Sequence, residues 1–270
     1  IPQLTYGGAE RVFHDHAREF AAAGHRVIEC VFDSSGKVDF PTQNELVGLD
    51  VPAAGSGLLS KARTFWQRAA RLRALKQHYQ ADVCISHLEG ADYVNLMSQG
   101  RAQRLLCIHN SKQHDWAMHL DFMGTVRRRL LIPWLYRRAD RVVPCSRGLA
   151  LELVEYTGLP AAKVTAITNI IEKSLILQQA SQPLTPAEEN LFAHGPVITV
   201  AGRLVPDKNQ GGLLAVLAGL RRSGHPNTRL IVLGDGPLRS DLVAQAQELG
   251  LRVWQSPAGA RDAAPPRKLS

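Results

Sequence analysis

VITVAGRLVPDKN, residues 197–209, is the stretch that decides the fold. Its first five residues form an apolar run that stops at Gly202, which predicts a buried strand. Arg203 follows at once, and a short loop then passes Lys208 and enters a predicted helix near Asn209. The loop would bring two cations to the end of a sheet, beside the N–H groups of a helix N-terminus. Arginine can donate to two phosphate oxygens and lysine adds a point charge, so the stretch predicts an anion site that suits a diphosphate.

Short apolar runs alternate with amphipathic segments on both sides of this stretch. The alternation predicts an α/β protein with parallel sheets. The chain has 270 residues, of which 45% are hydrophobic, and this is enough for two domains with separate cores. We predict a Rossmann-like N-terminal domain at 1–168, an interdomain connection at 169–195, an incomplete C-terminal domain at 196–254 and a disordered tail at 255–270.

The predicted elements follow from hydrophobic periodicity and from the positions of glycine and proline. Strands are expected at 26–32, 45–50, 82–86, 104–109, 141–146, 163–167, 197–201, 229–233 and 251–254. Helices are expected at 9–23, 58–79, 90–99, 125–138, 147–157, 186–193, 210–223 and 238–249.

Basic residues are concentrated in one part of the chain. The formal net charge is +8, and residues 56–141 contain fifteen lysines and arginines against six aspartates and glutamates. Such a concentration favours a polyanionic partner, such as an anionic lipid surface, a nucleic acid or a phosphorylated acceptor. A solvated basic face is the alternative. No motif typical of nucleic-acid binding accompanies the arginines, so we expect no nucleic-acid partner.

The four cysteines, at positions 30, 84, 107 and 145, lie in or beside apolar runs and form no C-x-x-C pair. They are therefore expected to be free thiols in a reducing compartment. No apolar run approaches the ~18 residues that span a bilayer, and no signal peptide is recognisable. A cytoplasmic location is expected.

A second glycine-containing loop lies near the start of the chain, at Tyr6-Gly7-Gly8-Ala9-Glu10-Arg11. Two glycines between a strand and a helix allow a ligand to approach the backbone, although a tight turn would also require glycine. The loop does not match the G-x-G-x-x-G dinucleotide fingerprint. Glu89 also follows a strand end, where site residues of open α/β sheets gather, or it serves as an N-terminal helix carboxylate.

Short motifs in a fixed order over residues 1 to about 254 resemble family 4 retaining glycosyltransferases of the GT-B fold. The motifs are Gly7-Gly8-Ala9-Glu10-Arg11, Gly24-His25-Arg26-Val27, Ala139-Asp140-Arg141-Val142 with Ser146, Asn169, Gly202-Arg203-Leu204 with Lys208-Asn209, and Leu233-Gly234-Asp235-Gly236-Pro237-Leu238. The resemblance implies two Rossmann-like domains and transfer of a sugar, with retention of configuration, from a nucleotide-sugar donor. The acceptor would be a glycan or a polyprenyl- or other lipid-linked sugar in bacterial surface polysaccharide or glycolipid synthesis.

The resemblance also assigns roles to individual residues. Arg203, Lys208 and His109 would be catalytic, the two cations at the leaving diphosphate and the histidine at the donor sugar. Glu10, Glu89 and Asn110 are expected on the acceptor side. The expected donor- or phosphate-binding residues are Gly7, Gly8, Gly202, Arg203, Lys208, Asn209, Gly234 and Gly236.

No metal or other cofactor is expected, because the two cations would do the work of Mg²⁺ at the leaving group. His14 and His16 would point about 200° apart on a helix and cannot share one ion. His109, His114 and His119, with Asp115 and Asp121, could form a metal site in a loop, but their spacings match no standard pattern.

The sequence departs from the family pattern at both ends. Nothing after Trp254 matches the family's E-x7-E pair, and Ile1-Pro2-Gln3-Leu4 reads as the exit of a strand whose body is missing. We expect about two thirds of a complete enzyme, with impaired activity. The alternative is a non-catalytic fragment that binds nucleotide sugars or polyanions.

Residues 127–138, RRRLLIPWLYRR, combine arginines with Trp134 and Tyr136. Basic helices with aromatic residues suit peripheral contact with an anionic membrane, here the inner face of the plasma membrane. Apolar residues in the core and solvated arginines are the alternative.

Overall fold

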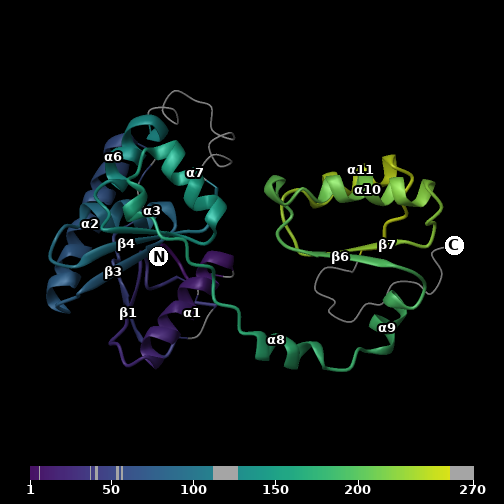
Figure 1. Ribbon diagram of the computed structural model, residues 1–270, viewed down its shortest axis with the longest axis horizontal. Coiled ribbons are helices and arrows are strands. Elements are labelled where there is room, and N and C mark those ends of the chain that lie inside the picture. The colour runs from purple at the N-terminus through teal and green to yellow at the C-terminus, as the bar shows by residue number, and fades with distance from the viewer. Residues whose placement is uncertain are drawn as a thin grey trace. The chain divides into compact units, whose positions relative to one another are not determined.

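The computed structural model describes residues 1–5, 7–36, 38–39, 42–52, 55, 57–111 and 127–255. The chain divides into two compact units, unit 1 (Ile1–Ile171) and unit 2 (Glu172–Ser270) (Figure 1). The division falls after Ile171, within the segment that the sequence predicts as a connection.

Unit 1 contains two parallel sheets. The larger has the order β3 (Val83–His87), β4 (Gln103–Ile108) and β5 (Arg141–Pro144), with Ser86 opposite Leu106 and Leu106 opposite Val142. The smaller pairs β1 (Ile28–Val31) with β2 (Glu45–Gly48). Because neighbouring strands run in the same direction, the carboxyl ends of β3, β4 and β5 meet at one edge of the larger sheet.

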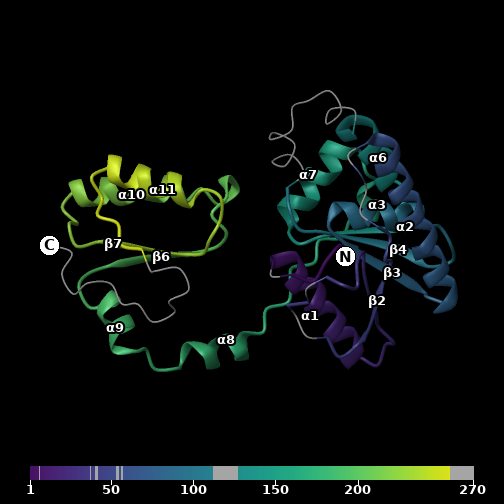
Figure 2. The ribbon, with the colours of Figure 1, turned by 180° about the vertical axis from the view of Figure 1, so that it is seen from behind.

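Helices lie on both sides of the larger sheet, with α3, α6 and α7 on one side and α1 on the other (Figures 1 and 2). The helices of unit 1 are α1 (Gly8–Ala22), α2 (Leu58–His78), α3 (Glu89–Met97), α6 (Ile132–Tyr136), which a π-helical turn at Arg127–Leu131 precedes, and α7 (Arg147–Thr157).

The core of unit 1 joins β4 and β5 to α6 and α7. Leu106, Ile132, Tyr136, Val142 and Leu153 are fully buried there. Each such side chain contributes about 1.5–3 kcal/mol through removal of apolar surface from water. This core fixes the strands whose ends carry the candidate residues of unit 1.

Local sequence signals set the ends of α7. The Ser146 hydroxyl accepts from the Leu149 N–H at 3.2 Å and so caps the N-terminus. Gly158 ends the helix with φ of 63°, the left-handed conformation that glycine adopts without a Cβ penalty. The predicted helix at 147–157 is therefore confirmed residue for residue.

Unit 2 is built on two parallel strands, β6 (Val197–Ala201) and β7 (Arg229–Leu233), with Val197 opposite Arg229. In Figures 1 and 2, α10 (Gln210–Arg222) and α11 (Arg239–Glu248) cover the same face of this pair. Their contact is apolar, through Leu214, Leu217, Ala218, Ala246 and Leu251. α8 (Lys173–Ala180), a 3-10 turn at Pro206–Lys208 and α9 (Pro186–Phe192) complete the described elements of unit 2.

Several predicted elements are wrong in detail. Residues 251–254 form no strand, because no neighbouring strand pairs with them in the part of unit 2 that the structure describes, and only Leu251 packs into the core. Residues 163–167 run beside β5 but form only the isolated bridge between Val164 and Val142. α8 was not predicted at all. The predicted tail beyond residue 255, the whole of 112–126 with His114 and His119, and thus the start of the predicted 125–138 helix lie outside the described residues.

All four cysteines are free thiols, as predicted. Cys107 is buried, and this burial raises the pKa of its thiol to about 12. Burial likewise raises the pKa of Cys30 to about 11. These thiols stay protonated and unreactive near neutral pH.

Candidate functional site

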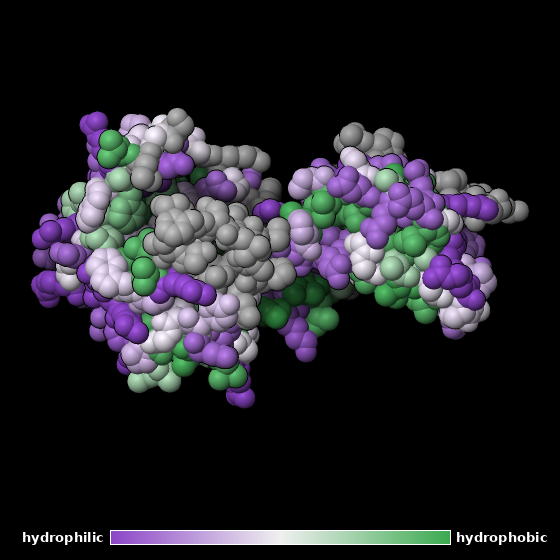
Figure 3. Space-filling model, turned by 90° about the horizontal axis from the view of Figure 1, so that it is seen from above, coloured by the Kyte–Doolittle hydropathy of each residue, from purple (hydrophilic) through white to green (hydrophobic). Residues whose placement is uncertain are grey.

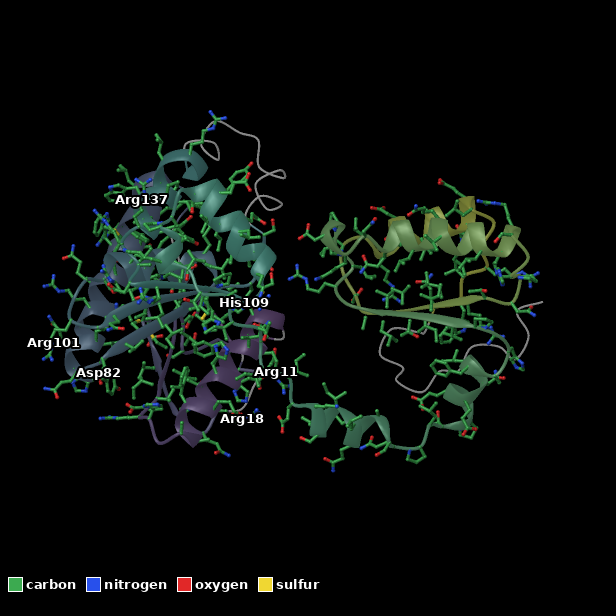
Figure 4. The ribbon with its side chains drawn as sticks, in the orientation of Figure 1. Arg11, Arg18, Asp82, Arg101, His109 and Arg137 are labelled. Atoms are coloured by element: carbon green, nitrogen blue, oxygen red, sulfur yellow. The ribbon has the colours of Figure 1, made fainter. Side chains whose placement is uncertain are left out.

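The carboxyl ends of β3 and β4 carry a small pocket of about 130 Å³. The edge of an open parallel sheet where strands end is the usual place for a ligand. Figure 4 labels His109 at this edge and labels Asp82 and Arg101, which precede β3 and β4, at the opposite one. The pocket is lined by Leu88, Glu89, Asp92, Cys107, Ile108, His109 and Asn110. It therefore brings together three residues that the sequence predicts for the site: Glu89, His109 and Asn110.

Two histidines lie side by side at this edge of the sheet. Nδ1 of His87, the last residue of β3, lies 2.9 Å from Nε2 of His109, and one of the two nitrogens donates to the other. The rings are stacked, with their centroids 5.0 Å apart and their planes 19° apart. His87 is 1% exposed, so a rigid and buried ring holds the ring of His109.

Helix α1 completes the environment of His87. The rings of Phe13 and His16 each lie 5.4 Å from its ring, Phe13 with an edge-to-face orientation. Burial, helped by the nearby charges of His109, the N-terminal amine and His16, lowers the pKa of His87 to about 2. Desolvation also lowers the pKa of His16. His87 is accordingly a neutral imidazole at any physiological pH.

The Gly7-Gly8 loop opens α1, and its two glycines differ. A Cβ on Gly7 would lie 2.2 Å from Oε2 of Glu10, which is itself only 9% exposed, so Gly7 makes room for that carboxylate. A Cβ on Gly8 would meet no atom within 4 Å. Gly8 therefore borders open space at the N-terminus of α1, where backbone N–H groups attract an anion.

A buried polar network beside the pocket was not predicted from the sequence. Asp92 is fully buried, and its carboxylate accepts from Ser86 Oγ at 2.7 Å and from Tyr136 OH at 3.2 Å. Leu88, between His87 and α3, has φ of 74°, an uncommon value for a residue with a Cβ. Such strain is found where surrounding contacts fix the backbone near a site.

The loops that follow β6 and β7 are joined through their backbones. The Leu204 N–H donates to Asp235 O at 2.9 Å, and the Leu238 N–H donates to Leu204 O at 3.2 Å. A Cβ on Gly234 would lie 2.0 Å from Gly202 O, and one on Gly236 would lie 2.5 Å from Leu204 O. Glycine is thus required at 234 and 236 because the two loops touch there.

This joined surface presents Arg203 and Lys208 to solvent, and neither side chain pairs with a carboxylate among the described residues. The aliphatic part of Lys208 lies against Gly202, with Cγ 3.9 Å from a Cβ placed on that glycine. Asn209 precedes α10 with φ of 48°. Gln210, 2% exposed and not predicted as a site residue, donates from Nε2 to Arg203 O at 2.9 Å. It therefore fixes the backbone that carries Arg203.

The predicted site residues thus fall into two groups, each at the carboxyl ends of parallel strands. Gly7, Gly8 and Glu10 begin α1 in unit 1, and Glu89, His109 and Asn110 line the pocket of the same unit. Six residues belong to the joined loops of unit 2: Gly202, Arg203, Lys208, Asn209, Gly234 and Gly236.

One group of side chains in the described part of the chain has the geometry to hold a metal ion. The ligand atoms of His16, His87 and Cys107 lie within 4.8 Å of one another. The sequence does not reveal this arrangement, because spacing along the chain relates His16 only to its helix neighbour His14 and not to strand residues far away. Since His87 already bonds to His109 and the Cys107 thiol is protonated, we assign the cluster to packing.

The family model named Glycosyltransferase Family 4 matches residues 6–175 of the chain. A second family model, Glycosyl transferases group 1, matches residues 181–262. The chain belongs to glycosyltransferase family 4. The two matches correspond closely to unit 1 and to the described part of unit 2.

Two curated relatives of this family 4 chain are glycosyltransferases. One, from Campylobacter jejuni, is 26% identical over 185 residues, which cover 68% of this chain and 47% of the relative. Its name is N-acetylgalactosamine-N,N'-diacetylbacillosaminyl-diphospho-undecaprenol 4-alpha-N-acetylgalactosaminyltransferase. The other, an uncharacterized glycosyltransferase of Methanocaldococcus jannaschii, is 30% identical over 123 residues, 46% of this chain and 30% of the relative. The matches span less than half the length of these relatives.

Solved structures show the same fold. Anabaena HepE, determined with UDP and glucose, has a TM-score of 0.65 at 18% identity, over 93% of this chain and 65% of HepE. WaaG, a glycosyltransferase involved in lipopolysaccharide biosynthesis, has a TM-score of 0.59 at 17% identity, over 92% of this chain and 65% of WaaG. The predicted α/β fold with parallel sheets, of the GT-B type, is confirmed over about 65% of the length of these proteins.

Proposed function

We propose that this protein transfers a sugar from a nucleoside diphosphate sugar to an acceptor hydroxyl with retention of configuration. The observation that carries the proposal is the joined loop surface of unit 2, which presents the exposed cations Arg203 and Lys208 beside the start of α10. HepE, which shares the fold, was solved with UDP, and a uridine diphosphate donor is the first to test.

The proposed chemistry follows from where charge develops. The bond between the anomeric carbon and the β-phosphate oxygen breaks, the acceptor oxygen attacks from the same face, and its proton passes to the departing phosphate. Arg203 and Lys208 stabilise the charge on that phosphate more in the transition state than in the ground state. His109, held by His87, binds the donor sugar, while Glu10, Glu89 and Asn110 face the acceptor.

The proposed acceptor is a glycan on a lipid diphosphate at an anionic membrane surface. The name of the Campylobacter relative includes an undecaprenyl diphosphate acceptor. In unit 1, Leu130 and Trp134 are 66% and 50% exposed, and the Arg138 guanidinium lies 3.7 Å from the centre of the Trp134 ring. Cations beside exposed apolar side chains suit the interface of an anionic bilayer. Among the described residues, no helix combines the length and apolar composition needed to cross a bilayer.

Nucleotide titration tests the donor site. We expect UDP to bind with millimolar or tighter affinity, and Arg203→Gln to weaken binding about tenfold, since a charge-assisted bond contributes roughly 1.5–3 kcal/mol. Arg222→Gln, an exposed arginine in the last turn of α10, is the matched control. Equal affinities of the two variants would remove Arg203 from the site.

Turnover is tested separately, as release of UDP from UDP-sugars in the presence of a polyprenyl-diphosphate glycan. We expect release to depend on the acceptor, to persist in EDTA and to fall at least tenfold in His109→Ala. Nucleotide binding without release would favour a nucleotide-sugar-binding protein over an enzyme. Loss of activity in EDTA, with recovery on adding Mg²⁺, would contradict the metal-independent mechanism.

A further inference from the structure

A second cationic pocket lies in unit 2, at the end of the strands opposite to Arg203 and Lys208. It has a volume of about 400 Å³ and is lined by His194, Arg221, Asn227 and Arg229. Arg229 is the first residue of β7, and Val197 at the start of β6 pairs with it. Because each strand has five residues, the pocket and the loops after the strands lie roughly 15 Å apart along the sheet.

Arg221 gives the pocket its chemistry. The Nε atom of its guanidinium is fully buried and has no hydrogen-bond acceptor within the described residues. The side chain also forms no ion pair with any carboxylate that the structure describes. A buried N–H without an acceptor costs about 1–3 kcal/mol, and more when the group is charged. Because this Nε is closed to solvent it cannot itself bond to a ligand, but Arg221 lines the pocket and brings its positive charge there.

Hydrogen bonds fix two other residues of the pocket, Arg229 and His194. One nitrogen of Arg229 donates to the carbonyls of Asn190 and Leu191, at 3.2 Å each, and so closes the C-terminal end of α9. Nε2 of His194 lies 2.9 Å from Asn190 Oδ1. These bonds hold a second guanidinium and an imidazole at the pocket before any ligand arrives, which reduces the entropy lost on binding.

The surrounding charge favours an anion. Residues 209–234 contain three arginines and a histidine but no aspartate or glutamate. On the neighbouring α9, Glu188 is occupied at the capping box with Thr185 and bonds to the Thr185 N–H and hydroxyl. Glu189 of α9 is exposed, and among the described residues no carboxylate contacts the guanidinium of Arg221 or Arg229.

We propose that this pocket binds the phosphate group of a small phosphorylated metabolite, at a site separate from the donor loops. Guanidinium groups match phosphate oxygens in geometry and charge. The volume exceeds that of a bare phosphate and accommodates a phosphate monoester with a sugar-sized substituent. Binding there stabilises unit 2, because the ligand joins α9, the end of α10 and the start of β7.

The test begins with the full chain carrying Arg203→Gln and Lys208→Gln, so that the donor loops no longer bind phosphate. Calorimetry and thermal unfolding are then measured with inorganic phosphate, a hexose 6-phosphate and succinate. We expect the hexose phosphate to bind most tightly and to raise Tm, and succinate to bind at least tenfold more weakly. Tighter binding of free phosphate than of the monoester would assign the site to the inorganic ion.

Variants of Arg221 then test whether the hexose phosphate binds in this pocket. Arg221→Gln should weaken hexose phosphate binding about tenfold, whereas Arg222→Gln, one residue further on the exposed side, should change it less than twofold. Arg221→Lys keeps the charge and gives a second folded variant, with intermediate affinity expected. Equal affinity in all three variants, or no binding of any phosphate compound, would overturn the proposal while leaving the donor site at Arg203 untouched.

Discussion

His87 shows how much one side chain can determine at a strand end. Its ring bonds to His109 at 2.9 Å and contacts Phe13 and His16 of α1, so it links the pocket to the Gly7-Gly8 loop. The sequence contained a usable signal, since Ser86-His87-Leu88-Glu89 ends a predicted strand. Only Glu89 was chosen there, because linear spacing does not reveal that the ends of β3 and β4 lie side by side.

The stability of the protein should depend on pH through His87. The folded state holds this imidazole neutral down to a pKa of about 2, whereas in the unfolded chain it titrates near its ordinary value of 6.5. The unfolded state therefore binds more protons below pH 6.5, and the free energy of unfolding should fall as the pH falls, by about 1 kcal/mol between pH 6.5 and 5.5. Above about pH 7.5, where the unfolded imidazole is also neutral, this contribution is nearly constant.

Urea unfolding at several pH values checks this expectation with His87→Phe. The groups facing His87 are His16, His109, the Cys107 thiol and the Ile1 amine, and they remain in the variant. Because the variant lacks the hydrogen bond to His109, its free energy of unfolding at pH 7.5 should be about 1 kcal/mol lower. Its free energy of unfolding should also depend less on pH. An unchanged slope would assign the acid sensitivity to other groups. His225→Phe, at an exposed position of unit 2, is the control.

At the scale of elements, the start of α1 offers a test in which stability and binding move in opposite directions. Gly8 lies in the first turn of α1, and an added Cβ would meet no atom within 4 Å. Gly8→Ala should therefore raise the free energy of unfolding by up to about 0.5–1 kcal/mol, because alanine loses less backbone entropy in a helix. If the donor phosphates approach this turn, the same methyl group should weaken nucleotide-sugar binding several-fold. Unchanged affinity, measured by calorimetry, would remove Gly8 from the donor site.

At the joined loops of unit 2, we expect a single added methyl group to destabilise the protein strongly. Gly234→Ala places a Cβ 2.0 Å from the Gly202 carbonyl oxygen, and backbone cannot move aside as a flexible side chain would. The free energy of unfolding should fall by about 3 kcal/mol or more, because the added Cβ overpacks the contact and because φ of Gly234 is 148°. Gly224→Ala is the control, because φ there is 99° and an added Cβ would meet no atom within 4 Å. Only backbone strain should destabilise this variant, by about 1 kcal/mol. Similar losses in both variants, measured by urea unfolding, would mean that the loops can separate.

The elements themselves were largely predictable, and the misses have physical causes. The helix at 147–157 was predicted from its periodicity, and Ser146 and Gly158 fix its two ends. The strand expected at 251–254 failed because an apolar run becomes a strand only beside a partner. α8 was missed because its sequence, KSLILQQA, lies in a polar, proline-containing segment and none of its residues is buried. Helices without a buried face leave a weak hydrophobic pattern.

At the scale of the whole molecule, the basic excess of residues 56–141 is only partly a surface property. Lys76 is 7% exposed and donates to Asn95 Oδ1 at 2.8 Å and to Ser98 Oγ at 2.6 Å. Arg104 pairs with Asp140 at 3.2 Å. Counting charges along the sequence could not separate such internal cations from those on the surface, because burial depends on contacts between helices α2 and α3 and on strand pairing.

The remaining exposed cations and apolar side chains should still favour an anionic bilayer. Figure 3 shows hydrophobic and hydrophilic residues interspersed on the visible face of unit 1, so binding should be weak, peripheral and sensitive to salt. Cosedimentation with vesicles of anionic lipid should decrease several-fold in Leu130→Ser with Trp134→Ser. Leu151→Ser, which alters a 71% exposed residue of α7, should not change it. Equal binding to neutral and anionic vesicles would contradict the proposed membrane surface.

The contact between the loops after β6 and β7 also limits how this protein can diverge. A Cβ at position 234 would clash with the backbone carbonyl oxygen of Gly202, so no replacement of the side chain at position 202 can relieve the clash. Substitution of Gly234 is therefore disfavoured, and the backbone at this contact should stay the same. Side chains that project from that surface, such as Asp235, which is 80% exposed, stay open to change. If these loops hold the donor as proposed, preference for a base or a sugar would evolve through such side chains, while the backbone beneath them stays the same.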